Sequence, residues 1–294
     1  MSSLLKGSRK LLLGIGLAGA GAAVWAIMGG SEDKAFIKAS AFYDHYINNP
    51  RYFYEPPVTH KWDFNWDRRQ SDTLMKTLEG KFRAEDDKQS SQEKLQKAKV
   101  TASRHLLFIR HGQYTLNGKT DEERSLTELG RQQAYLAAQR LKELNLPYSQ
   151  IVQSTMTRAK QTAQIICKEL PDVPVSSSDL LREGLPILPE PSNNKEINNV
   201  RAFTDGPRIE AAFRRYFYRA TPDQKVDSYE IFVCHANVIR YFVCRALQLP
   251  PEAWLRFSLH NCSLTWIAIR PSGRVTVYTV GDCGFIPQGK LTTT

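Results

Sequence analysis

The sequence predicts an α/β domain with a largely parallel β-sheet over residues 100–288, preceded by one transmembrane helix over residues 11–30. Two observations predict this architecture. After residue 100, short apolar runs of strand length alternate with amphipathic helical patterns, which is typical of strands joined by crossover helices. Residues 11–30 contain no charged side chain, and a helix of that length spans roughly the 30 Å of a bilayer's hydrocarbon core.

The first ten residues are basic and precede the apolar stretch. Lys6, Arg9 and Lys10 lie there, and the first acidic residue of the chain is Glu32. Mitochondrial targeting segments and secretory signals share this pattern, and the residues by themselves leave both open. We therefore expect residues 1–10 to be a basic N-terminus ahead of a membrane anchor.

Residues 31–99 form a juxtamembrane segment, aromatic at first and then, between 81 and 99, a charged and polar tether. Within it, over residues 62–67, a tryptophan twice precedes an aspartate, four residues apart. Tryptophan is favoured at protein interfaces, so this motif is suited to insertion into a neighbouring subunit or to packing on the chain's own domain. Composition leaves both open. The residues concerned are Trp62, Asp63, Asn65, Trp66 and Asp67.

The first half of the domain begins with the apolar run 105–109, which is typical of a strand buried on both faces. Thr127 is a suitable N-cap for a helix whose apolar side chains recur every three or four residues. A strand at 151–152 and a helix over 157–170 follow. The apolar face of the first helix consists of Ala134, Ala137, Ala138, Leu141 and Leu144.

The second half continues the alternation. Residues 205–219 are expected to form a helix, because apolar side chains again recur at helical spacing. A strand over 229–234 and a helix over 237–247 follow, strands over 264–269 and 275–280 close the domain, and 289–294 form a tail. The apolar face of the helix over 205–219 consists of Ile209, Phe213, Tyr216 and Phe217.

Composition narrows the class of protein. The chain is 41% hydrophobic, enough for a sizeable core, and its 40 basic against 30 acidic residues favour anionic partners. The basic residues are scattered among acidic ones, so nucleic-acid binding is not expected. The five cysteines form no Cys-x-x-Cys pair, and no metal site or disulfide framework is indicated. A Gly-x-Gly-x-x-Gly pattern at 14–19 falls in the predicted anchor and indicates no dinucleotide cofactor.

Two histidines follow predicted strands directly. Arg110 and His111 come after the first strand, and His235 comes after the strand over 229–234. The carboxyl ends of parallel strands meet at one edge of a sheet, where ligands bind, so both imidazoles should emerge there. Arg158 begins a helix and should point its guanidinium to the same edge. Glu183 lies in a turn that we expect to border this cleft.

These five residues match the needs of phosphoryl transfer. The reaction requires a nucleophile in line with the leaving group, positive charge around three oxygens, and an acid for the leaving group. In this scheme His111 attacks phosphorus, while Glu183 protonates the departing hydroxyl and then activates the hydrolytic water. Arg110, Arg158 and His235 hold the charge, and neither a metal nor a cofactor is required. The alternative for Arg158 and Glu183 is a structural ion pair.

Four motifs resemble those of the histidine phosphatase, or phosphoglycerate mutase-like, superfamily, and the resemblance covers nearly all of residues 100–288. It implies a three-layer α/β/α fold and a nucleophilic role for His111. The motifs are Arg-His-Gly at 110–112, Ser-Thr-Met-Thr-Arg-Ala at 154–159, Leu-Arg-Glu-Gly at 181–184 and Cys-His-Ala-Asn-Val-Ile-Arg at 234–240.

Within that superfamily, the apolar N-terminus, the motif over 62–67 and the stretch 228–241 are similar to its mitochondrial serine/threonine phosphatases. This resemblance implies phosphoprotein substrates carrying phosphoserine or phosphothreonine, with phosphohistidine as a further class and a stress-activated kinase kinase among the substrates. It also implies a single-pass anchor in a mitochondrial membrane. The motif over 62–67 would assemble homo-oligomers that raise the activity.

Two alternative functions are kept. The first is a small-metabolite mutase or phosphatase with the same His111 chemistry, although Glu183 is followed by Gly-Leu-Pro rather than by the Arg-His-Tyr-Gly of metabolic mutases. The second is a catalytically weak scaffold that binds phosphoproteins without turning them over. The presence of all five catalytic residue types counts against the scaffold.

Overall fold

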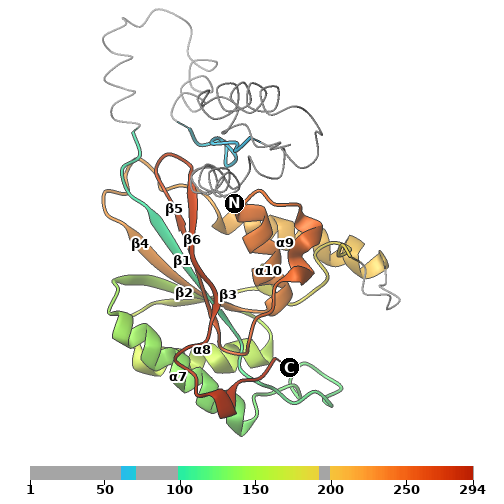
Figure 1. Ribbon diagram of the computed structural model, residues 1–294. Helices are drawn as coiled ribbons and strands as arrows, with labels where there is room; N and C mark the ends of the chain where they lie inside the picture. Colours follow the sequence, from blue (N-terminus) through green and yellow to red (C-terminus); the bar gives the residue numbers. More distant parts are fainter. Residues whose placement is uncertain (1–60, 71–98, 192–198, 294) are drawn as a thin grey trace, which may run out of the picture. The chain divides into compact units, whose positions relative to one another are not determined.

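A computed structural model describes residues 61–70, 99–191 and 199–293 (Figure 1). The basic N-terminus, the predicted anchor over 11–30 and most of the juxtamembrane segment lie outside the described residues. Among the residues that are described, no helix is both long and apolar enough to cross a membrane. Trp62–Thr294 group together as one compact unit.

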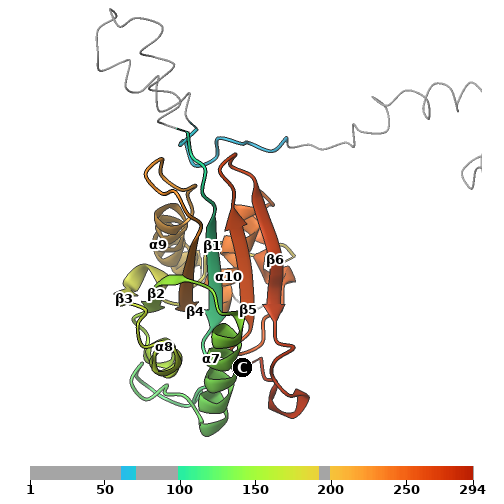
Figure 2. The same cartoon turned by 90° about the vertical axis from the view of Figure 1, so that its left-hand side faces the viewer.

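This unit is built on a six-stranded sheet with the strand order β3-β2-β4-β1-β5-β6 (Figure 2). The first four strands along the chain pair with one another in parallel: β1 with β4, β4 with β2, and β2 with β3. In contrast, β5 pairs antiparallel with both β1 and β6. The sheet is therefore mixed. The sequence pattern did not reveal the two antiparallel strands, because an apolar run predicts burial but not strand direction. The strands are β1 (Arg104–Arg110), β2 (Tyr148–Ser154), β3 (Val175–Ser178), β4 (Ser228–Cys234), β5 (Leu264–Ile269) and β6 (Val275–Asp282).

Four α-helices lie among the described residues, and each overlaps a predicted one. Thr127 caps the first, since its side chain accepts a hydrogen bond from the N–H of Gly130 at 3.0 Å. The third helix begins at Asn199 rather than at 205 and ends at Tyr216 rather than at 219. The helices are α7 (Glu128–Leu144), α8 (Thr157–Glu169), α9 (Asn199–Tyr216) and α10 (Ala236–Ala246).

β1 lies inside the domain and divides its core in two. Every residue of the strand is buried. Leu106 and Phe108 pack into one apolar cluster with side chains of α9 and α10. Leu107 and Ile109 face the opposite side, where side chains of α7 and α8 pack. Helices therefore cover both faces of the sheet in a three-layer arrangement, which Figures 1 and 2 show from two directions.

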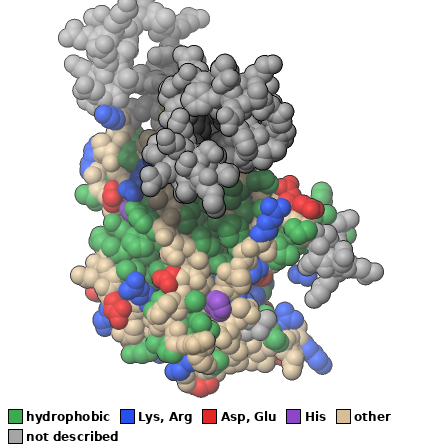
Figure 3. All heavy atoms as spheres, viewed as in Figure 1, with side chains coloured by type: hydrophobic (Ala, Val, Ile, Leu, Met, Phe, Trp, Pro, Cys, Tyr) green, Lys and Arg blue, Asp and Glu red, His purple; other side chains and the backbone are tan. Residues whose placement is uncertain are grey.

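Some elements carry no hydrophobic signal. β3 is an edge strand of one valine and three serines, and its side chains are largely exposed, so its sequence resembles a loop. On the face seen in Figure 3, basic and acidic side chains are interspersed between apolar ones. Short 3₁₀ turns at Asp179–Leu181, Pro251–Arg256 and Gln288–Lys290 are also present in the part of the chain that the structure describes.

Candidate active site

The two strand-end histidines lie side by side. β1 and β4 are neighbouring parallel strands in which Arg110 is aligned with Cys234. His111 and His235, which follow these two residues, therefore leave the sheet at the same level. Their ring centroids are 5.1 Å apart, close enough for both imidazoles to contact one phosphoryl group. The sheet thus brings together the two side chains on which the sequence argument depends.

His111 is held by its own backbone and by its neighbours. Its N–H donates to the carbonyl of Cys234 at 3.0 Å, and the side-chain amide of Asn261 donates to its carbonyl at 3.1 Å. Nδ1 lies 2.8 Å from the carbonyl oxygen of Gly112. Because a carbonyl only accepts, Nδ1 carries the proton and Nε2 has the free lone pair. Burial, followed by the charges of the neighbouring arginines, lowers the pKa of His111 well below its ordinary value.

Arg158 reaches the same point from the first turn of α8. Its Nε lies 3.2 Å from Nε2 of His111, and its guanidinium stacks 4.6 Å from the ring centroid of Tyr114. Asp121 lies 3.7 Å from Nη1 of Arg158 and anchors the start of the helix by accepting hydrogen bonds from the N–H and hydroxyl of Thr157. Tyr114 and Asp121 thus hold the guanidinium in contact with His111.

Arg110 is the last residue of β1 and is buried. One of its terminal nitrogens donates to the carbonyl of Leu259 at 2.6 Å. Burial lowers the pKa of the guanidinium to about 10, and the nearby Glu183 opposes that shift. Arg110 therefore remains a cation at neutral pH, with little protein charge to balance it. A bound anion would supply that balance.

Glu183 lies in the loop after the Asp179–Leu181 turn, and its side chain is half-buried. Its Oε1 accepts a hydrogen bond from the N–H of Gly184 at 3.1 Å. Burial raises the pKa of the carboxyl, although Arg158 and Arg110 oppose the shift. A carboxyl group with a raised pKa, close enough to Arg158 and Arg110 to feel their charge, is suited to general acid catalysis.

His235 is oriented by Ser154, the last residue of β2. Nε2 of the imidazole and the serine Oγ are 2.8 Å apart, and both side chains are fully buried. Burial lowers the pKa of His235 well below its ordinary value, and His111 and Arg158 lower it further. Before a ligand arrives, His235 is therefore a neutral imidazole whose Nδ1 has no partner among the described residues.

Unpaired polar atoms gather around this site. Six buried side-chain nitrogen or oxygen atoms in the described part of the chain lack a hydrogen-bond partner, and five belong to residues of this cluster. Buried polar atoms are normally paired. Four of the five are nitrogen atoms, including one of Arg240, whose charge acts on Arg110, so the cluster is suited to an anion with several oxygens; the fifth, Asp121 Oδ1, faces Nη1 of Arg158 at 3.7 Å. Among the residues that the structure describes, no three His, Cys, Asp or Glu side chains are placed to hold a metal ion. The five atoms are Arg110 Nε, Asp121 Oδ1, Arg158 Nη1, His235 Nδ1 and Arg240 Nε.

Several residues of the site were not predicted. Ser154 could have been found, because it is the last residue of β2. It therefore lies at the same edge of the sheet as His111 and His235, which follow β1 and β4. Thr162, which accepts a hydrogen bond from the N–H of Gly112 at 3.1 Å, lies one helical turn beyond Arg158. Tyr114, Asp121 and Asn261 come from loops, for which the sequence offered no positional signal.

A strand-end histidine between arginines, on a mixed sheet covered by helices, is the arrangement of a phosphoryl-transfer enzyme. The family model described as "Histidine phosphatase superfamily (branch 1)" matches residues 106–186 and 193–280. The chain belongs to this superfamily. The family expected from the sequence motifs is therefore confirmed.

Two curated relatives illustrate the similarity, and both are named "Serine/threonine-protein phosphatase PGAM5, mitochondrial". The Xenopus laevis protein is 55% identical over 239 residues, 81% of this chain and 86% of that one. The human protein is 51% identical over 232 residues, 79% of this chain and 80% of that one. Among solved structures, a Plasmodium falciparum phosphoglycerate mutase is 35% identical with a TM-score of 0.45, covering 62% of this chain and 92% of the mutase.

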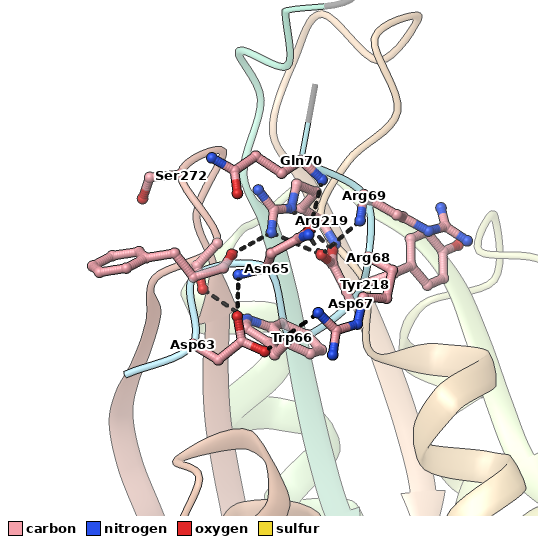
Figure 4. A network of polar contacts seen from close by, with 12 residues as sticks. Asp63, Asn65, Trp66, Asp67, Arg68, Arg69, Gln70, Tyr218, Arg219 and Ser272 are labelled. Atoms are coloured by element: carbon pink, nitrogen blue, oxygen red, sulfur yellow. Dashed lines mark hydrogen bonds and ion pairs between the residues drawn. The ribbon is translucent and has the colours of Figure 1, made fainter. Parts of the chain in front are cut away.

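The motif over 62–67 packs on the chain's own domain (Figure 4). Asp67 forms an ion pair with Arg219 at 2.7 Å, and the two side chains are only 2% and 3% exposed. Arg219 also donates to the carbonyl of Phe64 at 2.5 Å. Hydrogen bonds and the charge of Arg219 outweigh the effect of burial and lower the pKa of Asp67. One aspartate of the motif is thus held by the segment that follows α9.

The tryptophans of the motif differ in their contacts. Trp66 donates its indole N–H to the carbonyl of Gly273 at 2.7 Å, whereas the indole N–H of Trp62 is buried without a partner among the described residues. The backbone N–H and carbonyl of Asp63 bond to the side chain of Gln248, each at 2.9 Å. Asn65 accepts from the N–H of Gln70 at 3.0 Å. Within one chain, the motif thus follows the second of its two interpretations, intramolecular packing.

Proposed function

We propose that this chain is a mitochondrial membrane-anchored phosphatase that removes phosphate from phosphoserine and phosphothreonine in proteins through a phosphohistidine on His111. The observation that carries the proposal is the unprotonated Nε2 of His111, 3.2 Å from the guanidinium of Arg158. A neutral nucleophile beside fixed cations is suited to attack on a phosphate dianion. The names of the relatives from Xenopus laevis and human support the substrate class and the compartment.

In the first step, Nε2 of His111 forms a bond to phosphorus while the bond from phosphorus to the seryl or threonyl oxygen breaks. In this mechanism Glu183 starts in the protonated form, which burial favours by raising its pKa, and it passes that proton to the departing oxygen. The side chain leaves as a neutral hydroxyl. Arg110 and Arg158 hold the equatorial oxygens, where charge spreads in the transition state.

In the second step, the ionised Glu183 takes a proton from water as the water oxygen attacks phosphorus. The bond between nitrogen and phosphorus breaks, its electron pair returns to Nε2 of His111, and inorganic phosphate leaves. Glu183 ends the cycle protonated, as it began. Each step uses only side chains of this chain and water, so no metal enters the mechanism.

His235 acts as a switchable donor in this scheme. Its pKa is low in the free site, but a phosphate dianion beside the ring favours the protonated form. Because Ser154 occupies Nε2, Nδ1 is the nitrogen available to a phosphate oxygen. His235 is then protonated, and positively charged, only when a phosphate is bound beside it.

Substrate breadth and domain organisation complete the proposal. Phosphohistidine as a further substrate class, and a stress-activated kinase kinase as one substrate, rest on the family resemblance alone. We assign residues 1–10 to a basic N-terminus, 11–30 to the anchor, 31–99 to the juxtamembrane segment, 100–288 to the catalytic domain and 289–294 to a tail.

We also propose that the chain forms homo-oligomers through the motif over 62–67 and that assembly raises activity. The unpartnered indole N–H of Trp62 supports a role for the motif beyond packing on its own domain. Light scattering of the full chain and of the Trp62→Ala/Trp66→Ala double variant tests this proposal. A smaller, less active species is expected, and unchanged mass and rate would refute assembly through the motif.

The catalytic proposal is tested with phosphoserine and phosphothreonine peptides and the full chain. His111→Ala should lower kcat/KM by at least about 10³-fold. Brief reaction followed by alkaline quenching should trap an acid-labile phosphoryl group, which mass spectrometry should locate on His111. Faster turnover of phosphoglycerates than of phosphopeptides would favour the metabolite enzyme. Equal background rates in wild type and His111→Ala would favour the scaffold.

A further inference from the structure

One guanidinium from α9 holds the loop that carries Glu183. Nη1 of Arg208 donates to the carbonyl of Leu180 at 3.1 Å and to that of Arg182 at 2.6 Å. Nη2 donates to the carbonyl of Glu183 itself at 3.2 Å. These carbonyls lie in or just after the Asp179–Leu181 turn, where no strand or α-helix satisfies them, so Arg208 supplies hydrogen bonds that longer regular structure would provide.

Asp205 completes this clamp one helical turn earlier on α9. Its Oδ1 accepts from Nη2 of Arg208 at 3.2 Å, and its Oδ2 accepts from the N–H of Leu185 at 3.0 Å. The two side chains pack so closely on Gly184 that an added Cβ there would lie 2.6 Å from Nη2 of Arg208. Only glycine leaves room for this contact, and the clamp therefore touches the backbone on both sides of Glu183.

The loop is tied to the histidine site from its other side. The side-chain amide of Asn237 donates to the carbonyl of Gly184 at 3.0 Å, and Asn237 lies two residues beyond His235 in the first turn of α10. The carboxylate of Glu183 accepts a hydrogen bond from the N–H of Gly184 at 3.1 Å, and a backbone hydrogen bond from Asn237 also acts on it. Both hydrogen bonds come from backbone groups, so the position of the carboxylate depends on how the loop is held against the first turn of α10.

We propose that Arg208, held by Asp205, is a positioning residue that places Glu183 for proton transfer to the leaving group. The inference rests on the proposed function, in which Glu183 is the general acid. A displacement of about 1 Å at a catalytic group can cost about 100-fold in rate, and Arg208 supplies three of the hydrogen bonds that hold this loop in place. Arg208 contacts neither substrate nor reacting atoms in this proposal.

The proposal separates two kinds of substrate. An alkyl phosphate such as a phosphoserine peptide needs a proton on its leaving oxygen, whereas p-nitrophenyl phosphate releases a stable anion and gains little from an acid. Displacing Glu183 should therefore slow the first substrate much more than the second. A general loss of structure would slow both alike, so the ratio of the two kcat/KM values reports positioning.

The test compares the full-length wild type with Arg208→Lys, which keeps the charge but cannot reach three carbonyls with one planar fork. We expect kcat/KM for the phosphoserine peptide to fall about 100-fold and that for p-nitrophenyl phosphate to fall less than about 5-fold. Arg214→Gln, on the same helix but in an exposed pair with Glu210, is the matched control and should change neither. Equal losses on both substrates, or no loss, would overturn the clamp.

Glu183→Gln distinguishes the clamp from the proposed function. If Glu183→Gln slows both substrates equally, the general-acid role fails and the clamp fails with it. If Glu183→Gln is selective for the peptide and Arg208→Lys is not, the clamp alone is wrong. Should Arg208→Lys not fold, as judged by circular dichroism, Asp205→Asn gives the same comparison, because Arg208 and Leu185 bond to different oxygens of Asp205 and an amide keeps only one of those two acceptors.

Discussion

Nε of Arg158 lies 3.2 Å from Nε2 of His111, and both side chains are buried. The proposed nucleophile is thus in contact with a donor before any substrate arrives. Burial and the two neighbouring arginines lower the pKa of His111, so the ring stays neutral at physiological pH. When a phosphate enters, its oxygens must accept the hydrogen bond from Arg158 in place of Nε2 of His111. The lone pair of Nε2 is then available to attack phosphorus.

Replacing Arg158 with lysine should separate charge from geometry. Lysine keeps the cation but loses both Nε and the planar fork, so it cannot contact His111 and two phosphate oxygens together. We expect kcat/KM on phosphopeptides to fall about 10²–10³-fold, with a weaker inhibition by inorganic phosphate. Arg140→Lys, at an exposed pair with Glu143, is the control. Wild-type inhibition by phosphate in Arg158→Lys would contradict this role for Arg158.

Removing the hydroxyl that orients His235 should impair catalysis with little loss of structure. In Ser154→Ala, Nε2 loses its partner at 2.8 Å, and the imidazole can change its tautomer or rotate. The free energy of unfolding should fall by about 1 kcal/mol, while kcat/KM should fall about 10-fold. Ser177→Ala, on the exposed edge strand β3, removes a hydroxyl bonded to Gln153 and should change neither. Unaltered kinetics in Ser154→Ala would rule out its orienting role.

The sequence located the histidines because parallel pairing acts through the backbone. Whatever their side chains, residues that follow β1 and β4 must emerge at one edge, and His111 and His235 are those residues. Arg158 follows from the same rule, since α8 starts just after β2. The helices that cover each face of the sheet were located too, because their buried side chains are apolar and recur at helical spacing in the sequence.

The rest depended on contacts that no local pattern records. The position of Glu183 depends on Arg208, which belongs to a helix that starts beyond the loop. Equally, nothing in the motif over 62–67 names Arg219 as the partner of Asp67, and composition could not choose between intramolecular packing and insertion into a neighbour. Such pairings require the three-dimensional arrangement.

Acid should destabilise the protein through its buried histidines. The pKa values of His111, His235 and His105 are all lowered, in each case chiefly by burial. A histidine with a lowered folded-state pKa contributes stability that is present above its unfolded pKa of about 6.5 and is lost as the pH falls toward the folded value. His111 and His235, whose pKa values are lowered furthest, should each reduce the free energy of unfolding by about 1 kcal/mol between pH 6.5 and 5.5. Urea unfolding across this range measures the loss.

Two further groups sharpen this pH prediction. Glu183 acts in the opposite direction, because its pKa is raised and its protonation therefore stabilises the folded state as the pH falls. His105 lies outside the site, in contact with Tyr229 and Asp227. His105→Gln should therefore retain most of the wild-type loss on acidification, because His111 and His235 remain. A pH-independent midpoint from 7.5 to 5.5 would contradict neutral burial of these imidazoles.

Removing the charge of Asp67 should release the motif from the domain. Asp67→Asn preserves the shape of the side chain but leaves the buried guanidinium of Arg219 without its counter-charge, which typically costs about 3–5 kcal/mol. Asp63→Asn is the matched control in the same motif, because its ion pair with Arg68 at 3.9 Å is exposed and contributes less than about 1 kcal/mol. Hydrogen exchange over residues 62–70 should accelerate strongly in Asp67→Asn and little in Asp63→Asn. Equal exchange in the two variants would mean that the ion pair with Arg219 does not hold the segment in place.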